Sequence, residues 1–128
     1  MERFEYPRFS RWRSELPVAV AEAVAADLEY LQRFGRGAAL DAVRHRIQTS
    51  EHFPDMSETR TEVDHEGRRW VIRCLAVFAN EDRTVVLCVG GDKARWALEH
   101  PKGPDWYDAW VPVADQVFEA IKESKGWT

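Results

Sequence analysis

Two apolar runs separated by a short polar segment dominate the hydrophobic pattern of this chain. Residues 69–79 and 84–89 are rich in β-branched and aromatic side chains, which favour β-strands. Residues 80–83 between them are polar and have the length of a hairpin turn. The two runs are therefore expected to pair as an antiparallel hairpin. Because they are almost continuously apolar instead of alternating, both faces of this hairpin should be covered by other elements.

A weaker strand signal and a pair of glycines flank the hairpin. Residues 59–65 alternate polar side chains with Val63 and predict a more exposed strand, which turns at Glu66 and Gly67 into the hairpin. Gly90 and Gly91 are expected to end the last strand, where backbone without Cβ atoms can lie close to a ligand.

Helical periodicity precedes and follows these strands. Between Pro17 and Gly35, apolar residues recur at i, i+3, i+4 and i+7, which predicts a helix with one buried face that ends at the glycine. The other predictions are a short helix or turn over residues 7–16, a short helix over 37–47, a loop over 49–55, a surface excursion over 94–106 and a closing helix from about Tyr107 to Gly126. This order of elements predicts an α+β fold.

Length and composition bound the class of protein. A chain of 128 residues is expected to form one domain, residues 1–128, without a stabilising disulfide or metal. The formal net charge of −4 gives no overall attraction for nucleic acid, so RNA contacts would need a local basic patch. No run approaches the roughly 20 apolar residues of a membrane span, and the first residues lack the apolar core of a signal peptide. No membrane association and a cytoplasmic location are therefore expected.

Cysteines and histidines give no sign of a redox or metal site. Cys74 and Cys88 both fall within predicted strands, where cysteine usually behaves as a small buried hydrophobic residue. Both are expected to be reduced, although their positions on paired strands leave a disulfide across the hairpin open. The four histidines are scattered one to a segment, and the common catalytic motifs are absent, so neither a metal nor another cofactor is predicted.

Arg73 interrupts the most apolar strand of the chain. A guanidinium among Val71, Ile72, Cys74 and Leu75 must be paired or must face a cleft, because an unpaired buried charge costs several kcal/mol. One interpretation is an ion pair with a carboxylate such as Glu62 or Asp64. The other is a functional site.

Several basic and hydroxyl-bearing side chains could converge at the strand ends and grip a phosphodiester. The candidates are Arg60, Arg68, Arg69, Arg73, Lys93, Arg95 and Tyr107. The alternative for Arg68, Arg69 and Arg95 is plain exposure to solvent, and for Tyr107 it is an interfacial aromatic residue.

An ordered set of segments resembles a known family. The segments are LQRFG, TSEHFPDMSETR, GRRWVIRCLAVF, VVLCVGGDK and WYDAWVPVAD, and the resemblance as a whole spans roughly Phe9 to Lys122. In this order they look like the RelE/HigB-like toxins of type II toxin–antitoxin systems, in the phage-derived subgroup of the RelE/ParE superfamily.

The resemblance implies both a fold and a function. The fold would be RelE-like, with N-terminal helices packed on a small curved antiparallel sheet and a C-terminal helix. The function would be that of a toxin and hydrolase: a metal-free endoribonuclease that binds and cleaves mRNA, usually on the ribosome, and so inhibits translation and growth. A cognate antitoxin, commonly a helix-turn-helix protein, would neutralise it.

Individual residues match the motifs of the family. Glu58 and Arg60 match its E-x-R strand, Arg73 the arginine of the next strand, Asp92 and Lys93 the GDK exit, and Trp106 and Tyr107 the WY pair. Arg60, Arg73 and Lys93 would stabilise charge on the scissile phosphate, with Tyr107 as a further catalytic candidate. Arg68, Arg69 and Arg95 would bind RNA. His52 is a candidate acid or base, because its ordinary pKa lies near working pH.

Departures from the family pattern keep a second hypothesis open. Ser57 and Glu51 stand where basic residues are common, Thr59 replaces a leucine, residues 97–105 look inserted, and the usual first strand is reduced to residues 2–6. A catalytically degenerate module on the same fold, which binds an antitoxin or inhibits another target such as gyrase, is therefore the alternative.

Overall fold

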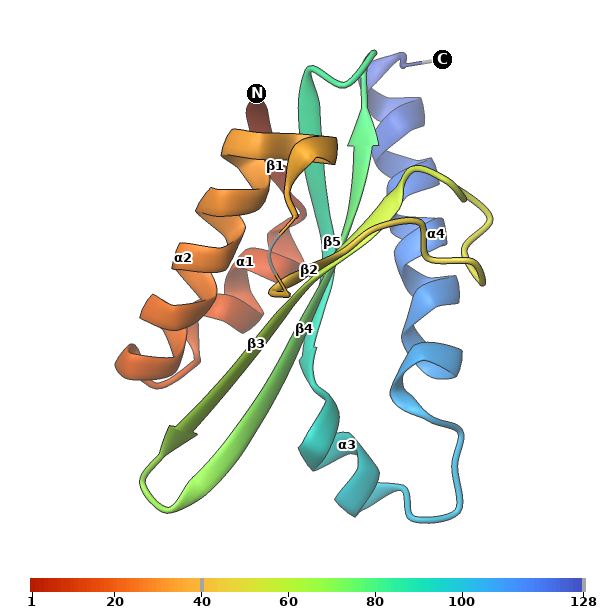
Figure 1. Ribbon diagram of the computed structural model, residues 1–128. Helices are drawn as coiled ribbons and strands as arrows, with labels where there is room; N and C mark the ends of the chain where they lie inside the picture. Colours follow the sequence, from red (N-terminus) through yellow and green to blue (C-terminus); the bar gives the residue numbers. More distant parts are fainter. Residues whose placement is uncertain (40, 128) are drawn as a thin grey trace.

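The computed structural model describes residues 1–39 and 41–127. Along this part of the chain the elements are β1 (Glu2–Glu5), α1 (Pro7–Ser14), α2 (Val18–Phe34), the 3₁₀ turn η1 (Gly35–Gly37), β2 (Val43–Arg44), β3 (Met56–His65), β4 (Arg68–Ala79), β5 (Thr84–Asp92), α3 (Lys93–Glu99) and α4 (Trp106–Lys125). The predicted α+β class, with N-terminal helices, a curved sheet and a C-terminal helix, is confirmed (Figure 1). None of the described helices is both long enough and apolar enough to cross a bilayer.

Within the described residues the sheet has five strands in the order β1-β5-β4-β3-β2. The predicted β4–β5 hairpin is present, and β3 pairs antiparallel with β4 over ten residue pairs, from Met56 opposite Val77 to His65 opposite Arg68. By contrast, β1 lies parallel to β5 at the other edge. The end of the β3–β4 hairpin that carries its turn, at Glu66 and Gly67, extends away from α4 (Figure 1).

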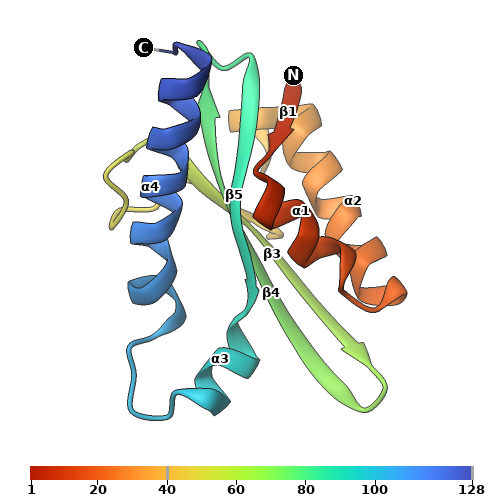
Figure 2. The same ribbon diagram turned by 180° about the vertical axis from the view of Figure 1, so that it is seen from behind.

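Helices cover both faces of the sheet, as the continuous apolar strands predicted. Helices α1 and α2 lie on one face and α4 lies on the other (Figure 2). Each face has its own core, one centred on Val24, Leu28 and Leu31 of α2, the other on Phe118 and Ile121 of α4. Cys74 belongs to the first core and Cys88 to the second, and both are free thiols. The disulfide that the sequence left open is therefore not formed, because the two side chains lie on opposite faces.

The short helix predicted over residues 37–47 is wrong; residue 40 of this stretch lies outside the described residues. The chain forms the turn η1 and then β2, whose Val43 pairs with Thr59 of β3. The backbone carbonyl of Ala42 also accepts a hydrogen bond from Arg60 N at 2.6 Å. Pairing with the open edge of β3 satisfies the backbone and overrides a modest helical tendency.

Two predictions about the end of β5 also need correction. The strand does not end at its glycines, because Gly91 still pairs with Arg73 and Asp92 with Ile72. The segment predicted as a surface excursion has no buried residue in its first part, but it begins with a helix, α3. The Asp92 side chain caps this helix by accepting hydrogen bonds from the backbone N–H groups of Ala94 and Arg95. Residues 100–105 then lead without helix or strand into α4.

Candidate functional site

Tyr107 of α4 lies at the centre of a polar cluster that includes side chains from the β3–β4 hairpin. Its hydroxyl accepts a hydrogen bond from Nε of Arg73 on β4 at 3.1 Å and donates one to Oε1 of Glu58 on β3 at 3.1 Å. Tyr107 is in the first turn of α4, on the sheet face that carries the α4 core. The phenol is thereby fixed between a cation and a carboxylate.

Arg73 is nearly fully buried, with 3% of its surface exposed. Besides Tyr107, it donates from Nη1 to the carbonyl of Ile72 at 3.1 Å and lies 3.9 Å from Glu62 Oε1 through Nη2. Of the two carboxylates suggested by the sequence, Glu62 is therefore a partner, whereas Asp64 pairs with Arg69 at 3.2 Å. Arg73 therefore has both a carboxylate partner, Glu62, and a contact with Tyr107.

Glu58 is completely buried, with 0% of its surface exposed. Its Oε1 lies 3.0 Å from Nε of Arg44 and 3.9 Å from Nε of Arg60. Burial raises the pKa of this carboxyl group above its ordinary value of 4.5, while the charge of Arg44 and the Tyr107 hydrogen bond act in the opposite direction. Glu58 is thus a carboxylate held among cations with little access to water.

Lys93 and Arg44 both lie over the ring of Tyr107. The Lys93 Nζ is 5.0 Å and the Arg44 Cζ is 5.2 Å from the ring centroid, within the range of cation–π contacts. Burial, followed by the charge of Glu58, raises the pKa of Tyr107 above its ordinary value of 10. The phenol therefore stays protonated at neutral pH and donates a hydrogen bond to Glu58.

The strand register explains why these groups meet. Arg60 of β3 is directly opposite Arg73 of β4, which in turn is opposite Gly91 of β5, two residues before Lys93. Arg44 comes from β2 and pairs with Glu58. We call these six residues the Tyr107 cluster: Arg44, Glu58, Arg60, Arg73, Lys93 and Tyr107. It gathers four cationic side chains and a single carboxylate in a chain whose net charge is −4.

A half-open pocket of about 440 Å³ adjoins the cluster. Arg44, Arg46 and Tyr107 line it, together with Asp105 and Asp108 at the start of α4. Its volume is within the range of ordinary small-ligand sites. The exposed sides of Arg44 and Tyr107 are therefore accessible to a group of about the size of a nucleotide.

The other candidate residues lie outside the Tyr107 cluster. His52 Nε2 is 3.1 Å from Glu119 Oε1, and its ring packs edge-on against Phe118 of α4. Arg69 pairs with Asp64, and Arg95 pairs with Glu99 at 2.8 Å. Arg68 pairs with Asp92 and stacks on Trp70 with its Cζ 3.6 Å from the ring centroid. Each of these four residues thus faces a carboxylate elsewhere on the molecule.

Arg44 is the member of the cluster that sequence reasoning missed. It falls within residues 37–47, where the sequence predicts a short helix, and that prediction concealed its place on β2 beside Glu58. The one available signal was Glu58 itself, since a glutamate at the buried start of a strand requires cationic partners. Among residues 1–39 and 41–127, no three His, Cys, Asp or Glu side chains gather as a metal site would require.

Comparisons with known proteins support the fold. No protein-family model and no curated protein matches the chain. Among solved structures, the chain is similar to a mutant of the Escherichia coli toxin RelE in the free state, with a TM-score of 0.51 and 13% sequence identity. The similarity covers 77% of this chain and 88% of the RelE chain. At this identity the likeness concerns the arrangement of the backbone, and the fold is RelE-like.

Proposed function

We propose that this protein is the toxin of a toxin–antitoxin system and cleaves RNA without a metal ion at the Tyr107 cluster. The observation that carries the proposal is the Tyr107 hydroxyl held between Arg73 and Glu58, with three further cations around it. The RelE-like fold supports the same conclusion, because the similar structure is that of a toxin. The ordered sequence segments described above add a HigB-like, phage-derived subgroup to the proposal.

Binding of the RNA backbone follows from the exposed cations. Arg44 and Arg60 have side chains that are 49% and 45% exposed, so they can contact a phosphate in solution while their Nε atoms face Glu58. Arginine presents a planar fork of donors that matches two phosphate oxygens. Lys93, half-buried over the phenol, adds a point charge. Together these groups would stabilise the negative charge that builds on a phosphate under attack.

Proton transfer follows from the hydrogen-bond direction at Tyr107. In the proposed reaction the ribose 2′-oxygen attacks phosphorus and its proton passes to the Tyr107 oxygen as the phenol proton moves to Glu58. The bond between phosphorus and the 5′-oxygen breaks, and the Lys93 ammonium gives a proton to that oxygen. The products are a 2′,3′-cyclic phosphate and a 5′-hydroxyl. In this relay Glu58 accepts the proton through Tyr107, so it can act although it is buried and does not contact RNA.

The proposal includes partners and a location. The substrate would be mRNA, bound on the ribosome in the cytoplasm, and a cognate antitoxin, a helix-turn-helix protein, would block the toxin. His52, Arg68, Arg69 and Arg95 have no direct part in this reaction, since carboxylates outside the cluster engage them.

Expression of the chain alone in a bacterial host tests the proposal. Growth should stop and transcripts should shorten, and purified protein with ribosomes should yield fragments that end in cyclic phosphate. Lys93→Ala and Tyr107→Phe should each restore growth at equal protein level. Toxicity that survives both substitutions would exclude the Tyr107 cluster as its source.

A second candidate function is binding without cleavage on the same fold. It is favoured by the internal pairing of Glu58 and by the carboxylates of Asp105 and Asp108, which line the pocket beside Tyr107 and repel RNA. In that case the protein would bind its antitoxin while leaving RNA intact. Growth arrest with DNA damage and intact mRNA would instead indicate inhibition of gyrase.

A further inference from the structure

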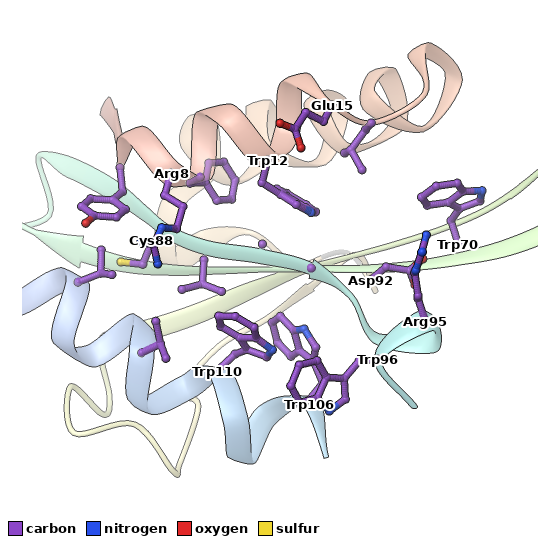
Figure 3. Close-up of a pocket in the computed structure, with 18 of the residues that line it drawn as sticks. Arg8, Trp12, Glu15, Trp70, Cys88, Asp92, Arg95, Trp96, Trp106 and Trp110 are labelled. Atoms are coloured by element: carbon purple, nitrogen blue, oxygen red, sulfur yellow. The ribbon is translucent and has the colours of Figure 1, made fainter. Parts of the chain in front are cut away.

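A second concave surface runs along the edge of β5, separate from the Tyr107 cluster (Figure 3). It encloses about 480 Å³ between α1 on one side and α3 and α4 on the other. Five of the six tryptophans of the chain line it: Trp12, Trp70, Trp96, Trp106 and Trp110. We call this surface the tryptophan groove.

The floor of the groove is an open strand edge. β1 pairs with β5 only as far as Glu5 opposite Leu87, whereas β5 continues to Asp92. Beyond Leu87, no described strand pairs with β5 on this side, because the chain turns away from the sheet into α1. An open edge presents unpaired N–H and C=O groups that can pair with an added strand.

Gly90 and Gly91 of β5 allow a tryptophan from each wall of the groove to pack directly on the strand. A Cβ atom on Gly90 would lie 2.1 Å from Trp12 Cζ3, and one on Gly91 would lie 2.5 Å from Trp106 Nε1. Trp12 and Trp106 therefore pack directly on the backbone, and Figure 3 shows them on opposite sides of β5. A strand added to this edge would place alternate side chains against Trp12 on one side and against Trp106 and Trp110 on the other.

Two opposite charges, Arg8 and Glu15, stand at the rim of the groove. Arg8 in the first turn of α1 and Glu15, the C-cap residue just after this helix, lie seven positions apart, and both line the groove. Arg95 and Asp92 at the same rim are already paired with Glu99 and Arg68, whereas Arg8 and Glu15 have no ion-pair partner among the described residues. Seven helical residues span about 10 Å. In an extended strand, side chains two or four positions apart lie on one face and span about 7 or 13 Å.

We propose that the tryptophan groove binds an extended peptide segment of a partner protein as an additional strand beside β5. The segment would present an acidic side chain to Arg8 and a basic one to Glu15, two or four positions apart, with apolar side chains facing the tryptophans. Backbone pairing supplies affinity in this mode of recognition, and the side-chain positions supply specificity. The inference does not rest on RNA cleavage.

A peptide fits this groove better than a second copy of the chain. The β5 edge forms the floor of the groove with α1 on one side and α4 on the other, so a chain that reaches it must pass between these helices. In a second copy the same edge lies between the same helices. The flanking helices of two copies would meet before their strand edges came within the roughly 4.8 Å that strand pairing requires.

The test uses the full chain and fluorescein-labelled octapeptides of alternating Thr and Val. Each peptide carries one Asp and one Lys on the same face, two or four positions apart, in both orders. Anisotropy should show saturable binding for one order and spacing and at least tenfold weaker binding for the others. Absence of binding by every member at millimolar concentration, or a dimer in light scattering that excludes the peptides, would overturn the proposal.

Charge reversal and backbone methylation sharpen the test. The doubly substituted Arg8→Glu, Glu15→Arg chain should lose roughly tenfold in affinity for the preferred peptide and regain it with the peptide whose charges are exchanged. N-methylation along the peptide should weaken binding at every second position, because only alternate N–H groups face β5. Strand addition is contradicted if exchanging the peptide charges leaves the affinity unchanged. It is also contradicted if N-methylation weakens binding without alternating along the peptide.

Tryptophan emission provides a matched control. Trp12→Phe should reduce the change in emission that the preferred peptide causes, whereas Trp127→Phe, which replaces the tryptophan outside the groove, should retain it. An equal loss for both variants would place the peptide elsewhere. Growth arrest and RNA cleavage by the charge-reversed chain should equal those of the unmodified chain, so failure of the groove proposal is distinguishable from failure of the proposed function.

Discussion

Trp106 and Tyr107 are neighbours in the first turn of α4, yet they belong to surfaces of opposite character. Trp106 is 2% exposed and packs on the backbone of Gly91 in the tryptophan groove. Tyr107 is half-buried and joins Arg73 to Glu58. Consecutive helical residues point about 100° apart, so one turn can serve two sites. The contrast teaches that neighbouring positions differ in exposure and contacts when their tertiary surroundings differ.

Different interactions also shape the two surfaces. The Tyr107 cluster depends on charge, because a carboxylate without exposure persists only among cations that offset the cost of its burial. The tryptophan groove depends on the absence of side chains, since Gly90 and Gly91 leave room for two indole rings. Substitutions that break one surface should therefore leave the other intact.

Tyr107→Phe is expected to have the largest effect. The change removes the hydroxyl that links Arg73 to Glu58, and loss of a proton-transfer group lowers reaction rates by about 10²- to 10⁴-fold. Cleavage of RNA by purified protein with ribosomes measures this, and peptide binding in the groove should not change. Tyr30→Phe is the control, since it removes a hydroxyl that accepts a hydrogen bond from Ala39 N outside the cluster. Equal activity of the two variants would exclude Tyr107 from catalysis.

Alanine substitutions at Gly90 and Gly91 should lower the free energy of unfolding by different amounts, because each glycine packs against a different wall of the groove. Gly91→Ala forces a methyl group against the buried Trp106 and should lower the free energy of unfolding by about 1–3 kcal/mol. Gly90→Ala should cost less, because Trp12 is partly exposed and its ring can shift. Gly37→Ala, which has no neighbour within 4 Å of the added Cβ, is the control. Urea denaturation gives the order, and a larger loss at Gly90 than at Gly91 would contradict it.

Lys93→Ala should weaken RNA binding to a smaller extent. If Lys93 contacts one phosphate, its loss lowers the slope of log affinity against log salt concentration by about 0.7 for single-stranded RNA. Titration of a labelled oligonucleotide at several salt concentrations measures this slope. Lys102→Ala, in the exposed segment before α4, should leave it unchanged. An unchanged slope for Lys93→Ala would show that this ammonium does not contact the RNA backbone.

The pH dependence of cleavage should show the smallest but most diagnostic effect. Glu58 must be deprotonated to receive the phenol proton, and burial raises its pKa above 4.5. Activity should therefore fall as pH decreases through a midpoint higher than that of an ordinary glutamate. The profile of kcat/KM against pH measures the midpoint, and Glu62→Gln should not abolish this acid limb. A midpoint at or below 4.5 would contradict a catalytic role for Glu58.

The sequence alone determined the parts of the protein that depend on local pattern. Apolar periodicity located α2 and α4, the continuous runs located β4 and β5, and the glycines at 35 and 126 marked where two helices end. These features follow from side chains within one or two turns of each other. The sequence also singled out Arg60, Arg73, Lys93 and Tyr107: charge in an apolar context pointed to Arg73, and a resemblance to a family pointed to all four.

Only the tertiary structure decided which of those side chains meet. The hydrogen bond from Tyr107 to Glu58 joins residues 49 positions apart, and the sheet face of Arg73 depends on the register of β3, β4 and β5. The same packing places His52 against Glu119 and recruits Arg44 through a two-residue strand. Strand register and helix docking are set by long-range burial, which local periodicity does not encode. For this reason the sequence named four side chains of the Tyr107 cluster, while the full membership of the cluster and the tryptophan groove emerged from the fold.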